Sequence, residues 1–131
     1  MVLVDTSVLI DYLNGSDNEH TEKFNVILEK NIPWGINSFI YQEVLQGART
    51  EKGYHVLKGY LSTQRFYCPK DERKSFEEAA MIYLKCRKKG ITIGSTIDCI
   101  IAQTAIENRL MLLHNDSDYV KISRVVGLRF F

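Results

Sequence analysis

Short runs of consecutive apolar residues alternate along this chain with longer segments in which apolar residues recur at helical spacing. The clearest runs are Val2–Val4 and Leu110–Leu113, which are short, apolar at successive positions and typical of buried strands. The pattern also favours strands at 33–36, 66–68 and around 125–129. Strands of this kind are predicted to lie in the interior of a sheet covered by helices.

The segments between these runs predict helices. The expected helices span residues 6–13, 19–30, 39–48, 54–61, 71–89, 96–108 and 117–122. Ser38 and Ser95 are expected to cap the third and the sixth of them. The helix over 71–89 has the most regular spacing, and the residues that it is expected to bury are Phe76, Ala79, Ala80, Tyr83 and Leu84. Strands that alternate with helices indicate an α/β fold with a central parallel sheet of four to five strands and helices on both faces.

Length and composition limit the class of protein. A chain of 131 residues with 45% hydrophobic residues is expected to form a single domain, residues 1–131, with its own core. Three separated cysteines without a C-x-x-C pair favour neither a disulfide framework nor a zinc site, and a reducing compartment is expected. No segment has the length of a membrane span, so we expect a cytoplasmic protein with no membrane partner.

Four acidic residues occupy positions where an unpaired carboxylate is unfavourable. Asp5 and Asp116 follow the two apolar runs, Glu43 lies on the apolar side of its predicted helix, and Asp98 opens another apolar helix. In parallel α/β sheets, ligands bind beyond the carboxyl ends of the strands, where Asp5 and Asp116 are expected. Oxygen ligands suit a hard divalent cation, so the pattern predicts one metal site that acts on phosphate.

Each acid also has a structural interpretation. Asp5 is suited to cap the helix that follows it, Glu43 to pair with a buried arginine, and Asp98 to close a capping box with Ser95. Asp116 lies in a polar turn, in which Asp118 is either a candidate fifth acid of the site or the cap of the short helix that follows. Four such coincidences in one chain favour the metal site, but the individual residues leave both interpretations open.

Four blocks in order along the chain resemble those of the PIN-domain nucleases, and among them the VapC-type toxins. The blocks are DTSVLID at 5–11, SFIYQE at 38–43, DCIIA at 98–102 and LLHNDSDY at 112–119. The last block of the family normally ends in D-x-D-F, and Tyr119 replaces the Phe here. We expect that replacement not to affect catalysis.

The resemblance implies a metal-dependent endoribonuclease, the toxin of a toxin–antitoxin pair, which hydrolyses phosphodiester bonds of RNA such as tRNA or rRNA. It implies Mg²⁺ or Mn²⁺ held by Asp5, Asp98 and Asp116, with Glu43 reaching the ion through a water and Asp118 supporting a second ion. Thr6, Ser95 and Asn115 are expected to orient water or phosphate. The implied partners are a cognate antitoxin and a second copy of the chain in a homodimer. The alternative is a catalytically silent PIN-like module that binds RNA or protein.

Overall fold

Two apolar runs lie side by side at the centre of a five-stranded parallel sheet. The computed structural model describes all 131 residues. Its strands are β1 (Val2–Val4), β2 (Trp34–Ile36), β3 (Arg65–Phe66), β4 (Met111–Leu113) and β5 (Arg129–Phe130). The strand order is β3-β2-β1-β4-β5, and every neighbouring pair is parallel. The predicted parallel α/β fold is therefore confirmed.

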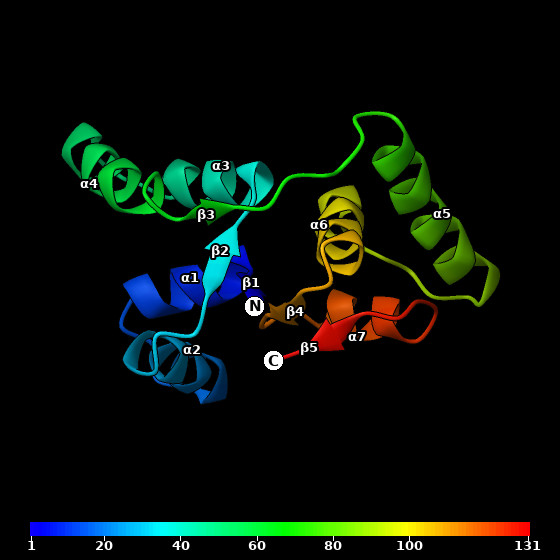
Figure 1. Ribbon diagram of the computed structural model, residues 1–131, viewed down its shortest axis with the longest axis horizontal. Helices are drawn as coiled ribbons and strands as arrows, with labels where there is room; N and C mark the ends of the chain where they lie inside the picture. Colours follow the sequence, from blue (N-terminus) through cyan, green and yellow to red (C-terminus); the bar gives the residue numbers. More distant parts are fainter.

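Seven helices connect and flank these strands. They are α1 (Thr6–Leu13), α2 (Glu19–Glu29), α3 (Ser38–Gln46), α4 (Glu51–Leu61), α5 (Lys74–Lys88), α6 (Thr96–Glu107) and α7 (Ser117–Ser123). Figure 1 shows α1 to α4 gathered around the β1-β2-β3 half of the sheet, and α5, α6 and α7 around the other half. None of the helices is both long and apolar enough to cross a membrane.

The strand order places a topological switch point between β1 and β4. From β1 the chain proceeds outward through β2 to β3, then returns to the other side of β1 for β4 and β5. Val4 is in register with Leu113, so the two strands end at the same edge. Loops diverge from such a point and leave room for a ligand. The segments that begin with Asp5 and His114 leave the sheet at this place.

The predicted buried face of α5 is only partly correct, since Ala79 is buried and Tyr83 is half-buried against the core. The buried residues of this helix are Ser75, Ala79, Ile82 and Cys86, whereas Phe76, Ala80 and Leu84 are exposed. Both stripes have helical spacing, and α5 packs mainly against α6 and to a lesser extent against α7, on the side of Ser75, Ala79, Ile82 and Cys86. Periodicity therefore identified the helix but not its inward side.

Several predicted boundaries also differ. The cap of α3 is Asn37 rather than Ser38, because the Asn37 Oδ1 accepts from the Ile40 N–H at 2.9 Å. The last strand was expected around 125–129, but a turn and bend occupy residues 124–126 and only Arg129–Phe130 pair with β4. The third strand is Arg65–Phe66 instead of 66–68.

Two helices start at other residues than predicted. Helix α4 starts three residues earlier because Thr50 caps it. Helix α5 starts three residues later, where Asp71 accepts from the Arg73 and Lys74 N–H groups.

The sheet requires a glycine at position 35. A Cβ built on Gly35 would collide with the carbonyl oxygen of Arg65 and lie 2.7 Å from the ring of Tyr67. We expect Gly35→Ala to lower the free energy of unfolding by about 1–3 kcal/mol, because β2 and β3 must separate to admit the methyl group. Urea unfolding measures the change. Gly59→Ala is the control: its Cβ meets nothing within 4 Å, and the helix interior favours alanine, so this variant should not lose stability. Equal stability of both variants would contradict the prediction.

Candidate active site

Asp5 and Asp116 leave adjacent strands and both cap the helices that follow them. The Asp5 Oδ2 accepts from the Ser7 N–H at 3.0 Å and from the Ser7 hydroxyl at 2.6 Å. The Asp116 Oδ1 accepts from the Asp118 N–H at 2.9 Å. Asp5 is only 5% exposed. The capping interpretation is thus correct for Asp5. Asp116, which was expected only to lie in a polar turn, caps α7 instead of Asp118. In both acids capping coexists with a position at the switch point between β1 and β4.

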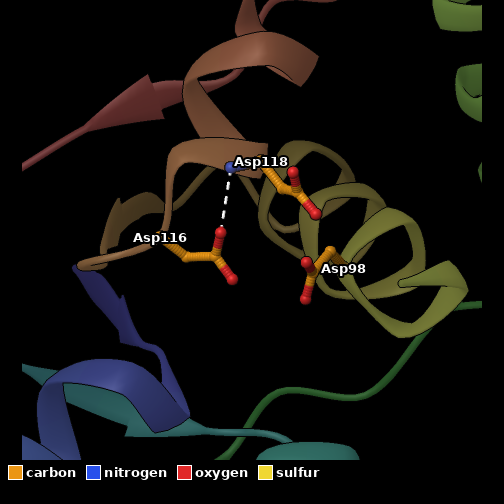
Figure 2. Close-up of side chains that lie close together, drawn as sticks. All are labelled: Asp98, Asp116 and Asp118. Atoms are coloured by element: carbon orange, nitrogen blue, oxygen red, sulfur yellow. Dashed lines mark hydrogen bonds between the residues drawn. The ribbon is translucent and has the colours of Figure 1, made fainter. Parts of the chain in front are cut away.

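Three carboxylates meet beside this point. One oxygen from each of Asp98, Asp116 and Asp118 lies within 4.8 Å of the other two. Figure 2 shows Asp98 projecting from α6 toward Asp116 and Asp118, which come from the start of α7. Asp118 is held there by the Gly94 N–H, which donates to its Oδ2 at 2.9 Å. The candidate fifth acid therefore belongs to the cluster.

Glu43 has no arginine partner. It is half-buried on α3, and its Oε1 accepts from the Thr6 hydroxyl at 2.9 Å. Burial raises the pKa of Glu43, the Thr6 hydrogen bond opposes this, and the nearby charge of Asp5 raises it further. The expected alternative, a salt bridge to a buried arginine, is wrong. Thr6 joins Glu43 to the segment that carries Asp5.

Asp98 has the most perturbed carboxyl group. Burial, followed by the charges of Asp116 and Asp5, raises its pKa from 3.8 to about 7. No hydrogen bond returns from Asp98 to Ser95, so the expected capping box is absent, although the Ser95 Oγ does accept from the Ile97 N–H at 3.2 Å. The contact that Asp98 does make is with the Tyr119 hydroxyl, 3.3 Å from its Oδ1. Raised carboxyl pKa values of this origin are typical of functional sites.

The polar residues expected to orient water or phosphate have other partners. The Thr6 hydroxyl donates to Glu43, and the Ser95 hydroxyl caps α6. The Asn115 side chain donates to the Asp11 Oδ2 at 2.8 Å. These three residues therefore stabilise the segments that carry the acids.

Three further residues contribute to the site and were not assigned to it from the sequence. The Ser7 hydroxyl donates to Asp5 and accepts from the Asn115 N–H at 2.9 Å, which ties the first loop to the last one. The His114 Nδ1 accepts from the Asp116 N–H at 3.1 Å, and burial lowers the pKa of this imidazole. The Tyr119 hydroxyl donates to the Asp5 Oδ1 at 2.8 Å. Tyr119 was the one detectable from sequence, since a buried tyrosine hydroxyl requires a partner.

The acids are almost without protein cations. The structure has two salt bridges, and the single one that reaches the cluster joins Lys121 Nζ to Asp118 Oδ1 at 3.4 Å. Asp5, Glu43, Asp98 and Asp116 have none. Buried carboxylates without a counter-charge are stable only when protonated or when bound to a cation. A donor set made only of carboxylate oxygens fits a hard divalent ion.

The whole arrangement is that of a known family. The sequence matches the PIN domain family over residues 2–125, and the chain belongs to that family.

Its relatives include Ribonuclease VapC11 of Mycobacterium tuberculosis, 28% identical over 130 residues, which cover 98% of this chain and 96% of the relative. VapC ribonuclease Mb1587 of Mycobacterium bovis is equally similar.

Among solved structures, VapBC2 of Rickettsia felis bound to a promoter DNA fragment superposes with a TM-score of 0.74 at 20% identity, covering 100% of this chain and 98% of that one. VapBC-1 of nontypeable Haemophilus influenzae gives 0.73 at 19% identity, with 100% and 97% covered. At these identities the structural likeness shows the fold.

The raised pKa of Asp98 predicts a pH dependence of stability. Between pH 4 and pH 7 the folded protein retains a proton on Asp98 that the unfolded chain loses, so the free energy of unfolding falls as pH rises through this window and levels off above it. Glu43 acts in the same direction and His114 in the opposite one, so the difference between wild type and Asp98→Asn isolates Asp98. Urea unfolding in EDTA at pH 4.5, 6.0 and 7.5 should show wild type losing stability relative to the variant. Parallel curves would contradict the assignment.

Proposed function

We propose that this chain is a metal-dependent endoribonuclease, the toxin of a toxin–antitoxin pair. The observation that carries the proposal is the cluster of Asp98, Asp116 and Asp118, with Asp5 joined to Asp98 through the Tyr119 hydroxyl and a single lysine as counter-charge. Membership of the PIN domain family and the ribonuclease names of the relatives support the same activity. The chain acts as one PIN domain, in the cytoplasm, on RNA such as tRNA or rRNA.

The residues of the site have two roles: four acids bind the metal ion, and Glu43 accepts a proton. Asp5, Asp98, Asp116 and Asp118 hold Mg²⁺ or Mn²⁺. A divalent ion held there would supply Lewis-acid chemistry, polarising the scissile phosphate and lowering the pKa of the attacking water. Glu43 is kept beside Asp5 by Thr6, and its raised pKa suits it to accept a proton from the attacking water.

An antitoxin is the proposed protein partner. An acidic cluster with a single lysine attracts a basic side chain, and a partner that supplies one would occupy the place of the metal. Helices α1, α3 and α4 form a groove whose apolar lining includes the exposed Ile10, Leu13 and Val56, the half-buried Leu57 and the buried Val44. This groove continues from the helix that Asp5 caps, so an apolar segment of the antitoxin can lie in it while the basic residue reaches the acids. The solved neighbours from Rickettsia felis and Haemophilus influenzae are VapBC structures.

The exposed stripe of α5 supports a homodimer. Phe76, Met81 and Leu84 are 42%, 44% and 38% exposed, and Phe76 also lines an apolar pocket with Phe39 and Ile97. Apolar side chains gathered on one helix face mark an interaction surface. A second copy of the same stripe, related by a two-fold axis, offers a matching apolar partner.

The nuclease proposal is tested with total RNA and Mg²⁺ or Mn²⁺. Asp5→Asn and Asp116→Asn should each lower the cleavage rate by about a hundredfold or more. Loss of a metal ligand weakens metal binding more than loss of a residue that only hydrogen-bonds to a ligand. EDTA should abolish cleavage. Asp17→Asn, an exposed acid outside the site, is the matched control and should retain full activity. Cleavage that survives EDTA or both substitutions would refute the site, and no cleavage by wild type under any metal would favour the silent binding module.

The dimer proposal is tested by Met81→Lys. The substitution adds charge to the centre of the α5 stripe without affecting the buried core, so the variant should elute as a monomer where wild type elutes as a dimer. Size-exclusion chromatography with light scattering measures the mass. Val56→Lys, equally drastic but placed on α4, should leave the dimer intact. A monomeric wild type at high concentration, or a dimeric Met81→Lys, would contradict this interface.

A further inference from the structure

Tyr119 brings a single hydroxyl into the acidic site from the core. The side chain is 0% exposed and is the largest of the fully buried ones. Its ring lies beside that of His114, with centroids 5.1 Å apart. The position of the hydroxyl is therefore set by close packing, which permits little movement.

The hydroxyl contacts two acids from two other elements. Its oxygen lies 2.8 Å from the Asp5 Oδ1 and 3.3 Å from the Asp98 Oδ1. A tyrosine hydroxyl has one proton, so the shorter contact is the donated hydrogen bond to Asp5. The hydroxyl is also within donor distance of the Asp98 Oδ1, a longer and weaker hydrogen bond, and the Asp98 carboxyl has no other hydrogen-bond partner. Thus α7 links the start of α1 to α6.

Both oxygens of Asp5 are consequently restrained. The Ser7 N–H and the Ser7 hydroxyl occupy the two lone pairs of the Asp5 Oδ2. The Tyr119 hydroxyl occupies one lone pair of the Oδ1 and leaves the other free. With donors on both oxygens, the carboxylate cannot rotate without losing a hydrogen bond at a buried position. The remaining lone pair of the Oδ1 is the only one that Asp5 offers to a cation.

We propose that Tyr119 is a positioning residue of the metal site: its hydroxyl orients Asp5 so that Oδ1 alone binds the cation, and it keeps Asp98 beside that atom. The inference rests on the proposed function, since it assumes that the acids bind a divalent ion. Residues that hydrogen-bond to a metal ligand raise the affinity for the metal, because they restrict the motion of the ligand side chain before the metal binds. This differs from the expectation that tyrosine in place of phenylalanine at position 119 leaves catalysis unaffected, because the hydroxyl contacts Asp5 and Asp98. A tyrosine that merely filled the core would have no effect on the metal.

The test is the affinity of the purified protein for Mn²⁺, measured by isothermal titration calorimetry. Tyr119→Phe removes one oxygen and keeps the ring, and it should weaken Mn²⁺ binding about tenfold, the lower end of the range for such neighbours. Tyr41→Phe is the matched control, since Tyr41 is half-buried against Phe66 and its hydroxyl has no partner. Its Mn²⁺ affinity should equal that of wild type. Urea unfolding in EDTA shows whether each variant is folded.

The outcomes separate this inference from the proposed function. If wild type binds no Mn²⁺, the metal site itself is refuted, and the role of Tyr119 with it. If wild type binds Mn²⁺ and Tyr119→Phe binds it equally or more tightly, the metal site stands and the positioning role is refuted. Should Tyr119→Phe fail to fold, Ser7→Ala tests the same restraint from the other oxygen of Asp5. That variant should weaken Mn²⁺ binding several-fold, and unchanged affinity would overturn the inference.

Discussion

Mutual repulsion among the carboxylates at the β1–β4 switch point is the constraint around which this fold is arranged. Helices α1, α3, α6 and α7 all begin next to it, with Asp5, Asn37, Ser95 and Asp116 as their caps. Free N–H groups at helix starts partly compensate negative charge. The carboxylates of Asp98 and Glu43 receive no backbone N–H, and burial, followed by the charges of Asp116 and Asp5, raises the pKa of Asp98 to about 7.

The site and the hydrophobic core are not separate regions. Asp5 directly follows a strand whose three residues are fully buried, and Tyr119 belongs at once to the core and to the hydrogen bonds of Asp5. A carboxylate attached to such a rigid base is held in place before any ligand arrives. The same rigidity keeps the mutually repelling acids close together, and they would move apart if the loops were mobile. The stability of the core therefore offsets the repulsion between the carboxylates.

Sequence reasoning succeeded where a local cause decides the outcome. The apolar runs predicted the central strands, and polar residues after them predicted Asp5 and Asp116 as neighbours at one edge, because parallel strands share the direction of their ends. It failed for α5, where two apolar stripes compete, and for the last strand, where Ile122 O accepts from the N–H groups of Val125 and Val126 and holds the chain in a turn. Asn37 replaced Ser38 as a cap because both residues suit that position.

The sequence by itself determined the alternation of strands and helices, the family blocks and the identity of the acids, since these depend on periodicity and residue type. Only the tertiary structure decided what each acid contacts. It excluded the arginine partner of Glu43 and the capping box of Asp98, gathered Asp118 into the cluster, and directed the Tyr119 hydroxyl to Asp5. Such contacts join residues up to 114 positions apart. Their geometry depends on how the whole core packs, and a local sequence pattern does not specify that packing.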